Sequence, residues 1–138
     1  MTITLEALLQ LTVFGSTVFA LALHPLEWFE ISRYRRRRRD ELRADDGLGF
    51  LKSSLNLESG YYLFVLGFLL IFYREPLLLV LVLVMTIAHV AARRSVSHTP
   101  SALKDRKRLG GALAFDILEL IFLVFLISEF WSLIGGTL

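Results

Sequence analysis

The chain has 138 residues, 55% of which are apolar, and it contains no cysteine. Soluble domains are usually about 45–50% apolar, so this composition argues against a water-soluble fold, and the lack of cysteine excludes disulfides, thiolate metal sites and a catalytic thiol from this chain. The net charge is only +2, and the basic residues are confined to two short segments. We therefore expect no binding of nucleic acid.

The first apolar segment predicts a membrane span over residues 3–26, because a helix needs about 20 apolar residues to cross the hydrocarbon core. Its start has neither a basic region nor a small-residue cleavage site, so we expect a retained span rather than a removable signal peptide. Pro25 predicts a bend where the chain leaves the membrane. Small and polar residues at every fourth position predict a helix-packing face: Thr12, Ser16, Ala20 and His24.

Two basic loops, residues 27–56 and 93–108, contain fourteen of the fifteen Lys and Arg residues. Positive clusters of this kind stay on the cytoplasmic side of a membrane. Near an anionic leaflet, each Lys or Arg also contributes about 1 kcal/mol of attraction. We predict that the loops dock on anionic headgroups at the inner face, or on an acidic partner, through Arg35, Arg36, Arg37, Arg38, Arg39, Arg106, Lys107 and Arg108.

The apolar region between the loops is too long for one span. As a single helix, residues 55–92 would be about 57 Å long, whereas the hydrocarbon core is roughly 30 Å thick. The sequence Tyr-Arg-Glu-Pro at 73–76 predicts a break, because proline disfavours helical geometry in the preceding residue and the two charges prefer water. This gives a second span over residues 57–72 and a third over residues 77–92.

A fourth span follows the second basic loop. Thr99 and Pro100 predict a helix start, as its N-cap and its first residue. The helix is expected to enter the membrane at about residue 109 and to span it over residues 109–133. Gly110 and Gly111, at the start of this span, are expected to allow close packing with another helix.

The distribution of charge selects the topology. Four spans place both basic loops on one side, whereas three would separate them, so the positive-inside rule favours four. The sequence therefore predicts an all-α membrane protein with a single transmembrane domain, built as an antiparallel bundle of four transmembrane helices with both termini on the non-cytoplasmic side. The lack of a targeting peptide favours the cytoplasmic membrane of a prokaryote. Aromatic residues are expected at the two interfaces: Trp28, Tyr61 and Tyr62 at the inner one, Tyr73 and Trp131 at the outer one.

Every predicted span carries an ionisable group toward its inner end. Imidazole and carboxylate are ligand types that suit a divalent transition metal or a proton relay. The candidates for an ion pathway or metal site are His24, Glu58, His89, Asp116 and Glu119. For the two histidines and Glu58, the alternative is snorkelling to the interface or a hydrogen bond to a neighbouring helix.

Asp116 and Glu119 are three residues apart and share a helix face. A carboxylate at this depth costs about 2.5–3.5 kcal/mol on insertion scales, so neither is expected to face lipid. An ion pathway, or a polar contact with another helix or a partner subunit, would explain both. Their spacing does not match the Glu-x-x-His pattern of di-iron bundles.

The sequence contains no hydrolase motif and no phosphate-binding motif. We therefore predict a non-enzymatic accessory or assembly subunit of a larger membrane complex, which contacts other subunits through Thr12, Asp116 and the Arg-rich loop. One alternative is a homo-oligomeric carrier or channel for protons or a divalent cation, with Asp116 and Glu119 in its pathway. Another is a haem- or chlorin-binding subunit that uses His24 and His89 as ligands. The cofactor, the metal and the oligomeric state stay open.

Overall fold

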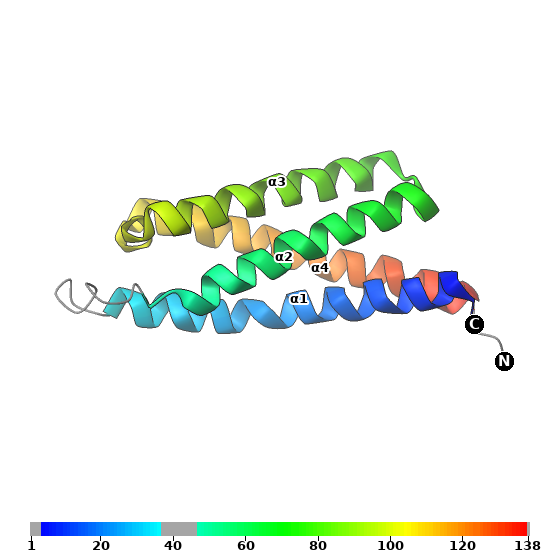
Figure 1. The fold of residues 1–138 in the computed structure, drawn as a ribbon, viewed down its shortest axis with the longest axis horizontal. Coiled ribbons are helices and arrows are strands. Elements are labelled where there is room, and N and C mark those ends of the chain that lie inside the picture. Colours follow the sequence, from blue (N-terminus) through cyan, green and yellow to red (C-terminus); the bar gives the residue numbers. More distant parts are fainter. Residues whose placement is uncertain (1–3, 37–46, 138) are drawn as a thin grey trace.

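The computed structural model describes residues 4–36 and 47–137 (Figure 1). The four long helices are α1 (Leu5–Arg36), α2 (Gly49–Phe68), α3 (Pro76–His98) and α4 (Arg106–Thr137). A π-helical segment, η2 (Leu69–Tyr73), continues α2, and a 3-10 helix, η3 (Pro100–Lys104), precedes α4. The predicted all-α fold, with four helices long and apolar enough to cross a membrane, is confirmed.

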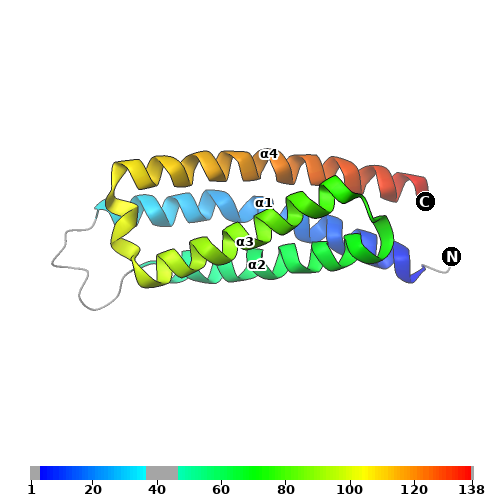
Figure 2. The same ribbon diagram turned by 90° about the horizontal axis from the view of Figure 1, so that it is seen from above.

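The four helices lie lengthwise beside one another (Figures 1 and 2). α1 packs against both α2 and α4, and α2 packs against α3. The start of α1, the turn between α2 and α3 and the end of α4 lie at one end of the molecule, called the turn end here (Figure 2). The end of α1, the start of α2, η3 and the start of α4 lie at the opposite end, called the basic end.

The predicted docking residues that the structure describes lie at the basic end and are exposed. They are Arg35 and Arg36 on α1, and Arg106, Lys107 and Arg108 on α4. Arg37, Arg38 and Arg39 lie outside the described residues. The positive charge of the described part of the chain is thus concentrated at one end of the bundle, as the two basic loops predict.

The helix break lies at the predicted tetrapeptide. Arg74 has a positive φ of 43°, and its N–H donates a 2.7 Å hydrogen bond to the Leu69 carbonyl, which closes η2. Pro76 occupies the first position of α3. The missing N–H of proline costs no helical hydrogen bond there, and its fixed φ suits the first turn.

The predicted bend at Pro25 does not end the helix. Pro25 lies inside α1, which continues to Arg36. Although proline removes one backbone donor, the helix beyond it is held by packing in the basic end of the bundle, where Ile31 and Tyr34 are buried. As a consequence, the residues after Pro25 stay on the same helix as those before it.

The start of α4 differs from the prediction. Thr99 and Pro100 begin the separate 3-10 helix η3, and α4 itself begins at Arg106. The carboxylate of Asp105 accepts a 3.0 Å hydrogen bond from the Lys107 N–H. Asp105 is therefore the residue that caps α4, because its side chain satisfies a backbone donor of the first turn.

The inward face of α1 is rotated relative to the predicted packing face. Ala20 and His24 are buried, but Ser16 is half-buried and Thr12 is exposed, with its hydroxyl bonded to the Leu8 carbonyl of its own helix. A step of four residues turns about 40° further than one helical turn, so a four-residue stripe drifts around the helix. Over three steps the drift is about 120°, which carries Thr12 away from the face of His24.

Gly110 and Gly111 make no close helix contact within the described chain. Both are exposed, and a Cβ atom added to either would have no neighbour within 4 Å. The expected close approach at these glycines would therefore require a neighbouring molecule.

Two apolar cores lie on either side of a buried polar layer. The first, toward the turn end, is called the turn-end core and includes Val13, Tyr62, Val65, Phe68, Leu69, Val82, Leu123, Leu126 and Phe130. The second, called the basic-end core, consists of Ile31, Tyr34, Leu48, Leu51, Leu55, Val96 and Leu109. Each helix thus contributes to the polar layer between two apolar stretches.

The outer surface of the bundle is rich in large apolar side chains. Phe19 on α1, Ile87 on α3 and Ile121 on α4 are 56%, 61% and 63% exposed. Water-soluble monomers rarely expose large contiguous apolar patches, whereas lipid-facing helices do so along their length. Together with the four long apolar helices, this surface indicates a membrane protein.

A hydrogen bond between α1 and α2 can be tested by removing the Tyr61 hydroxyl, which donates a 2.8 Å bond to the Thr17 hydroxyl. Such interhelical bonds in membrane proteins contribute about 0.6 kcal/mol on average and up to about 1.7 kcal/mol. We expect Tyr61→Phe to lower the free energy of unfolding by about 0.5–1.5 kcal/mol, measured by denaturant unfolding in detergent micelles. Tyr73→Phe is the control, because Tyr73 is exposed near the turn end. Equal losses in both variants would contradict this role of Tyr61.

Candidate metal centre

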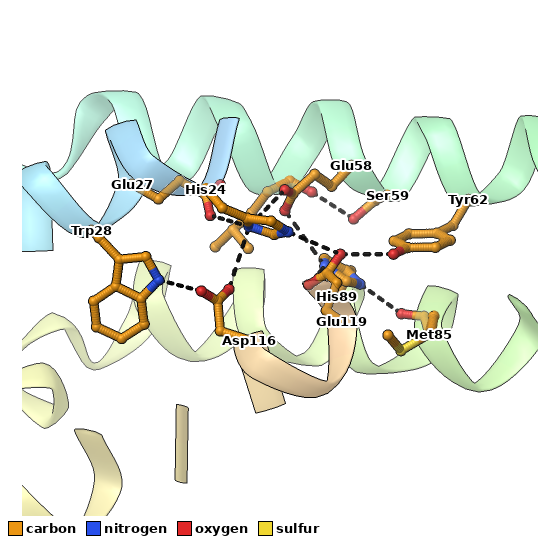
Figure 3. Close-up of polar contacts among 11 residues, drawn as sticks. His24, Glu27, Trp28, Glu58, Ser59, Tyr62, Met85, His89, Asp116 and Glu119 are labelled. Atoms are coloured by element: carbon orange, nitrogen blue, oxygen red, sulfur yellow. Dashed lines mark hydrogen bonds and ion pairs between the residues drawn. The ribbon is translucent and has the colours of Figure 1, made fainter. Parts of the chain in front are cut away.

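Six ionisable side chains from all four helices meet in the polar layer (Figure 3). This group, called the polar centre here, consists of His24, Glu27, Glu58, His89, Asp116 and Glu119. Five of the six are no more than 4% exposed, and the Asp116 side chain is 16% exposed. The bundle therefore buries two imidazoles and four carboxyl groups between its two apolar cores.

Helical spacing places these groups at one level. Asp116 and Glu119 are three residues apart on α4, so both can face the interior, as the sequence predicts. His24 and Glu27 have the same spacing on α1. Because α1 continues through Pro25, Glu27 lies on the same face as His24 and is buried.

The His24 ring is surrounded by carboxylates. Its Nδ1 atom lies 3.3 Å from Glu27 Oε2, 3.4 Å from Asp116 Oδ1 and 3.7 Å from Glu58 Oε1. Its Nε2 atom lies 3.9 Å from Glu119 Oε1. Hydrogen bonds of the N–H···O type are usually about 2.7–3.2 Å long. All four separations are therefore longer than the usual hydrogen bond.

His89 is held in one orientation by its own helix. Its Nδ1 donates a 2.8 Å hydrogen bond to the Met85 carbonyl, and because a carbonyl can only accept, Nδ1 carries the proton. Nε2 lies 2.9 Å from Glu119 Oε2 and 3.5 Å from Glu58 Oε2. In a neutral ring with its proton on Nδ1, Nε2 presents a lone pair to these two carboxyl groups. The lone pair of Nε2 and those of the carboxyl oxygens repel one another, and a proton or a cation between the nitrogen and the oxygens removes this repulsion.

Two aromatic side chains orient the carboxyl groups of α4. The Trp28 indole N–H donates to Asp116 Oδ2, and the Tyr62 hydroxyl donates a 2.7 Å hydrogen bond to Glu119 Oε1. Hydrogen bonds of this kind support the ligands of metal sites from the outer shell. Both aromatic residues were expected at the membrane interface, but Tyr62 is completely buried and Trp28 is partly buried beside the polar centre.

Among the described residues, several buried atoms of the polar centre have no hydrogen-bond partner: His24 Nε2, Glu27 Oε1 and Glu58 Oε1. Leaving a buried polar group unsatisfied costs about 1–3 kcal/mol, and more when it is charged. Figure 3 shows the His24 and Glu58 side chains directed into the cluster. The polar centre thus has lone pairs that hydrogen bonds of the described chain do not satisfy.

A cavity of about 240 Å³ adjoins the polar centre on the side of the basic end. Its polar wall is formed by Glu27, Glu58, His89, Asp116 and Glu119. The rest of the wall is mostly apolar and includes Ile31, Leu51, Leu55, Val96 and Leu103. The cavity offers room for water molecules or a small ligand beside the carboxyl groups.

The structure brings together all five ionisable residues that the sequence singled out. His24, Glu58 and His89 are each 1% exposed, so they face the interior instead of snorkelling to the surface. Glu27 was missed because the expected bend at Pro25 assigned it to the basic loop. Its spacing of three from His24, the same as that of Asp116 and Glu119, is the signal that identifies it.

The arrangement can exchange protons and can hold cations. Three sets of His and carboxyl groups have ligand atoms within 4.8 Å of one another. The haem and chlorin interpretation requires His24 and His89 to direct ring nitrogens at a flat ligand. Both histidines instead direct ring nitrogens toward Glu58 and Glu119, so these contacts give that interpretation no support.

The bond from Trp28 to Asp116 leads to a prediction for stability. Trp28→Phe removes the indole N–H and keeps an aromatic ring in place. A hydrogen bond to a charged group contributes about 1.5–3 kcal/mol, less where the group is partly exposed, and the Asp116 side chain is 16% exposed. We expect the free energy of unfolding to fall by about 1–2 kcal/mol, measured by denaturant unfolding in detergent with a chelator present.

Trp131→Phe is the matched control for this variant, because Trp131 is 65% exposed near the end of α4. The two substitutions remove the same atoms, and only the first removes the hydrogen bond to the polar centre. A loss of stability in Trp131→Phe as large as that in Trp28→Phe would contradict the assigned contribution of the bond.

Comparisons of this chain with protein-family models, with curated proteins and with solved structures find no match. A proposal for its function therefore rests on the residues of the polar centre and on their contacts.

Proposed function

We propose that the chain is an integral membrane protein that binds a divalent transition-metal ion in the middle of its helix bundle. The observation that carries this proposal is the pair of unpartnered carboxyl oxygens, Glu27 Oε1 and Glu58 Oε1, on two side chains that lie 3.3 and 3.7 Å from His24 Nδ1. Glu27 is 4% exposed and Glu58 is 1% exposed, so both carboxyl groups are shielded from bulk water. A cation beside the His24 ring would accept lone pairs from the imidazole nitrogen and from both carboxyl groups. The hydrogen bonds among the described residues leave these two oxygens unsatisfied.

The separations of the polar atoms suit a shared cation. Two ligand atoms, each about 2.1 Å from one ion, lie roughly 3.0–3.4 Å apart at octahedral or tetrahedral angles. The distances from His24 Nδ1 to Glu27 and Asp116 are 3.3 and 3.4 Å. The distance from His89 Nε2 to Glu58 is 3.5 Å. These values are long for hydrogen bonds and close to the edges of a metal coordination polyhedron.

The mixed set of ligands favours Mn²⁺ or Fe²⁺. Carboxylates suit Mn²⁺ and the harder ions, and imidazole suits Fe²⁺, Zn²⁺ and other transition metals. The chain has no cysteine to supply a thiolate for softer ions such as Cu⁺. Mg²⁺ prefers oxygen ligands and retained water, so two imidazoles favour a transition metal over Mg²⁺.

The packing supports a resident ion over an ion in transit. Between the polar centre and the turn end, the bundle is filled by the turn-end core, in which Val65, Leu123 and Leu126 are completely buried. An ion passing through this core would exchange its ligands for apolar side chains at a large desolvation cost. The carrier or channel interpretation is therefore less favoured than a bound metal.

The accessory-subunit hypothesis receives no support from Asp116. That hypothesis places Asp116 against a partner chain, whereas its carboxylate contacts Trp28 and His24 within the chain. All six ligands also come from one chain, so the metal site needs no second copy. Docking on anionic headgroups stays part of the proposal, because the described arginines of the basic end are exposed.

We further propose an antiparallel membrane bundle with its basic end in the cytoplasm. The positive-inside rule and the gathering of basic residues at one end support this orientation. The polar centre then lies in the cytoplasmic half of the bilayer, with its cavity on the cytoplasmic side. We propose the cytoplasmic membrane of a prokaryote as the compartment.

Metal binding is tested by stripping the purified protein with a chelator and reloading it with Mn²⁺. We expect Mn²⁺ to stay with the protein through desalting, as measured by elemental mass spectrometry, and to raise the unfolding temperature. Glu119→Gln preserves the shape of the side chain and removes its charge. We expect this variant to bind Mn²⁺ at least about tenfold more weakly, because even outer-shell changes cost 10–100-fold in affinity.

Glu129→Gln is the matched control, because Glu129 lies on the same helix toward the turn end and outside the polar centre. This variant should bind Mn²⁺ as tightly as the unchanged protein. A protein that retains no Mn²⁺, or equal binding by the two variants, would overturn the proposal of a metal site.

The proposed orientation can be read from single cysteines, since the chain has none of its own. Glu75, at the turn end, and Ser97, at the basic end, are both exposed. In intact bacteria producing the protein, Glu75→Cys should react with a membrane-impermeant maleimide, whereas Ser97→Cys should react only after permeabilisation. The opposite pattern of labelling would reverse the proposed topology.

A further inference from the structure

We infer that the polar centre holds two divalent cations bridged by the carboxylate of Glu58. This inference rests on the proposed metal binding and extends it from one ion to a dinuclear site. In two-metal sites the ions lie about 3.5–4 Å apart. A carboxylate can span that distance by giving one oxygen to each ion.

Glu58 faces both imidazoles at once (Figure 3). Its Oε1 lies 3.7 Å from His24 Nδ1, and its Oε2 lies 3.5 Å from His89 Nε2. The residue is 1% exposed, and Oε1 has no hydrogen-bond partner among the described residues. One ion at either histidine would use one oxygen of Glu58 and leave the other facing an imidazole. Two ions use both oxygens.

The other ligands divide into two sets on either side of Glu58. The first set surrounds His24 Nδ1, with Glu27 Oε2 at 3.3 Å and Asp116 Oδ1 at 3.4 Å. The second is His89 Nε2 with Glu119 Oε2 at 2.9 Å. With Glu58, each set supplies at least three ligand atoms, the number of protein ligands in many open metal sites.

The second set leaves the more open coordination sphere. It has one ligand atom fewer than the first set, and its histidine, His89, contributes to the wall of the adjoining cavity, whereas His24 does not. The cavity has room for the water molecules that complete the shell of a metal with three protein ligands. An exogenous ligand would therefore reach the ion at His89 from the basic end.

Charge balance also points to two cations. When ionised, the four carboxylates carry four negative charges, and their ion pairs in the described part of the chain are with His24 and His89. Leaving buried charge uncompensated costs several kcal/mol. One divalent ion with neutral imidazoles leaves two negative charges, which then require two protons. Two divalent ions balance all four carboxylates.

The test is a titration of the metal-stripped full chain with Mn²⁺ in detergent, followed by elemental analysis and electron paramagnetic resonance. We expect about two Mn²⁺ ions per chain and the spectrum of a spin-coupled pair, since ions about 3.5–4 Å apart interact through their bridge. A single ion with the spectrum of isolated Mn²⁺ would overturn this inference and leave the proposed metal binding in place. A chain that binds no Mn²⁺ would overturn both.

Glu58→Gln tests the bridge, because the amide keeps the shape of the side chain and removes its charge. We expect loss of one Mn²⁺ and of the spin coupling, with helix content by circular dichroism unchanged. Retention of a coupled pair would overturn the role of Glu58. If Glu58→Gln does not fold, Glu27→Gln is the second variant, and it must lower the count from two ions to one because it weakens the first set alone.

His98→Gln is the matched control, because His98 is an exposed histidine at the end of α3, outside the polar centre. Two coupled Mn²⁺ ions should remain in this variant. Loss of one ion from it would place that ion at the surface and overturn the dinuclear assignment.

Discussion

Four carboxyl groups are held close together inside an apolar bundle, where they repel one another when they are ionised. Pairs such as Glu27 with Glu58, and Glu58 with Glu119, have ligand atoms within 4.8 Å of each other. Two unit charges at about 4 Å repel by roughly 4 kcal/mol at an effective dielectric constant near 20. The two apolar cores prevent the helices from relieving this repulsion by moving apart, because separation would expose packed side chains of both cores.

Neutral groups of the surrounding scaffold fix the orientation of several ligands of the polar centre. The Met85 carbonyl fixes the tautomer of His89, and Trp28 and Tyr62 each donate to a carboxylate of α4. These contacts leave one side of His89, Asp116 and Glu119 bonded to the scaffold and the other side directed at the middle of the cluster. The outer shell of a metal site is expected to orient the ligands in this way before an ion binds.

The sequence predicts where the helices lie along the chain better than it predicts which face of each helix points into the bundle. The four helices and the break at Arg74 follow from features of the nearby sequence. These features are the lengths of the apolar segments, the positions of the arginines, and Pro76. The face that each helix turns inward depends on what meets in the interior. On α1, the burial of His24 and Glu27 selects the rotation that places Val13 inside and Thr12 outside. A stripe of small residues shows which helix face can pack closely against a neighbour. The burial of the polar centre determines which face does so.

The basic end cannot replace an ion in the polar centre. Arg33 is the arginine of α1 that is nearest in sequence to Glu27, six residues away, or about 9 Å along the helix. At that distance and an effective dielectric constant near 20, the attraction between Glu27 and Arg33 is about 1.8 kcal/mol, less than half of the roughly 4 kcal/mol of repulsion within a neighbouring pair of carboxylates. The arginines thus set the orientation of the bundle, while the charge of the cluster must be neutralised from within, by protons or by bound cations.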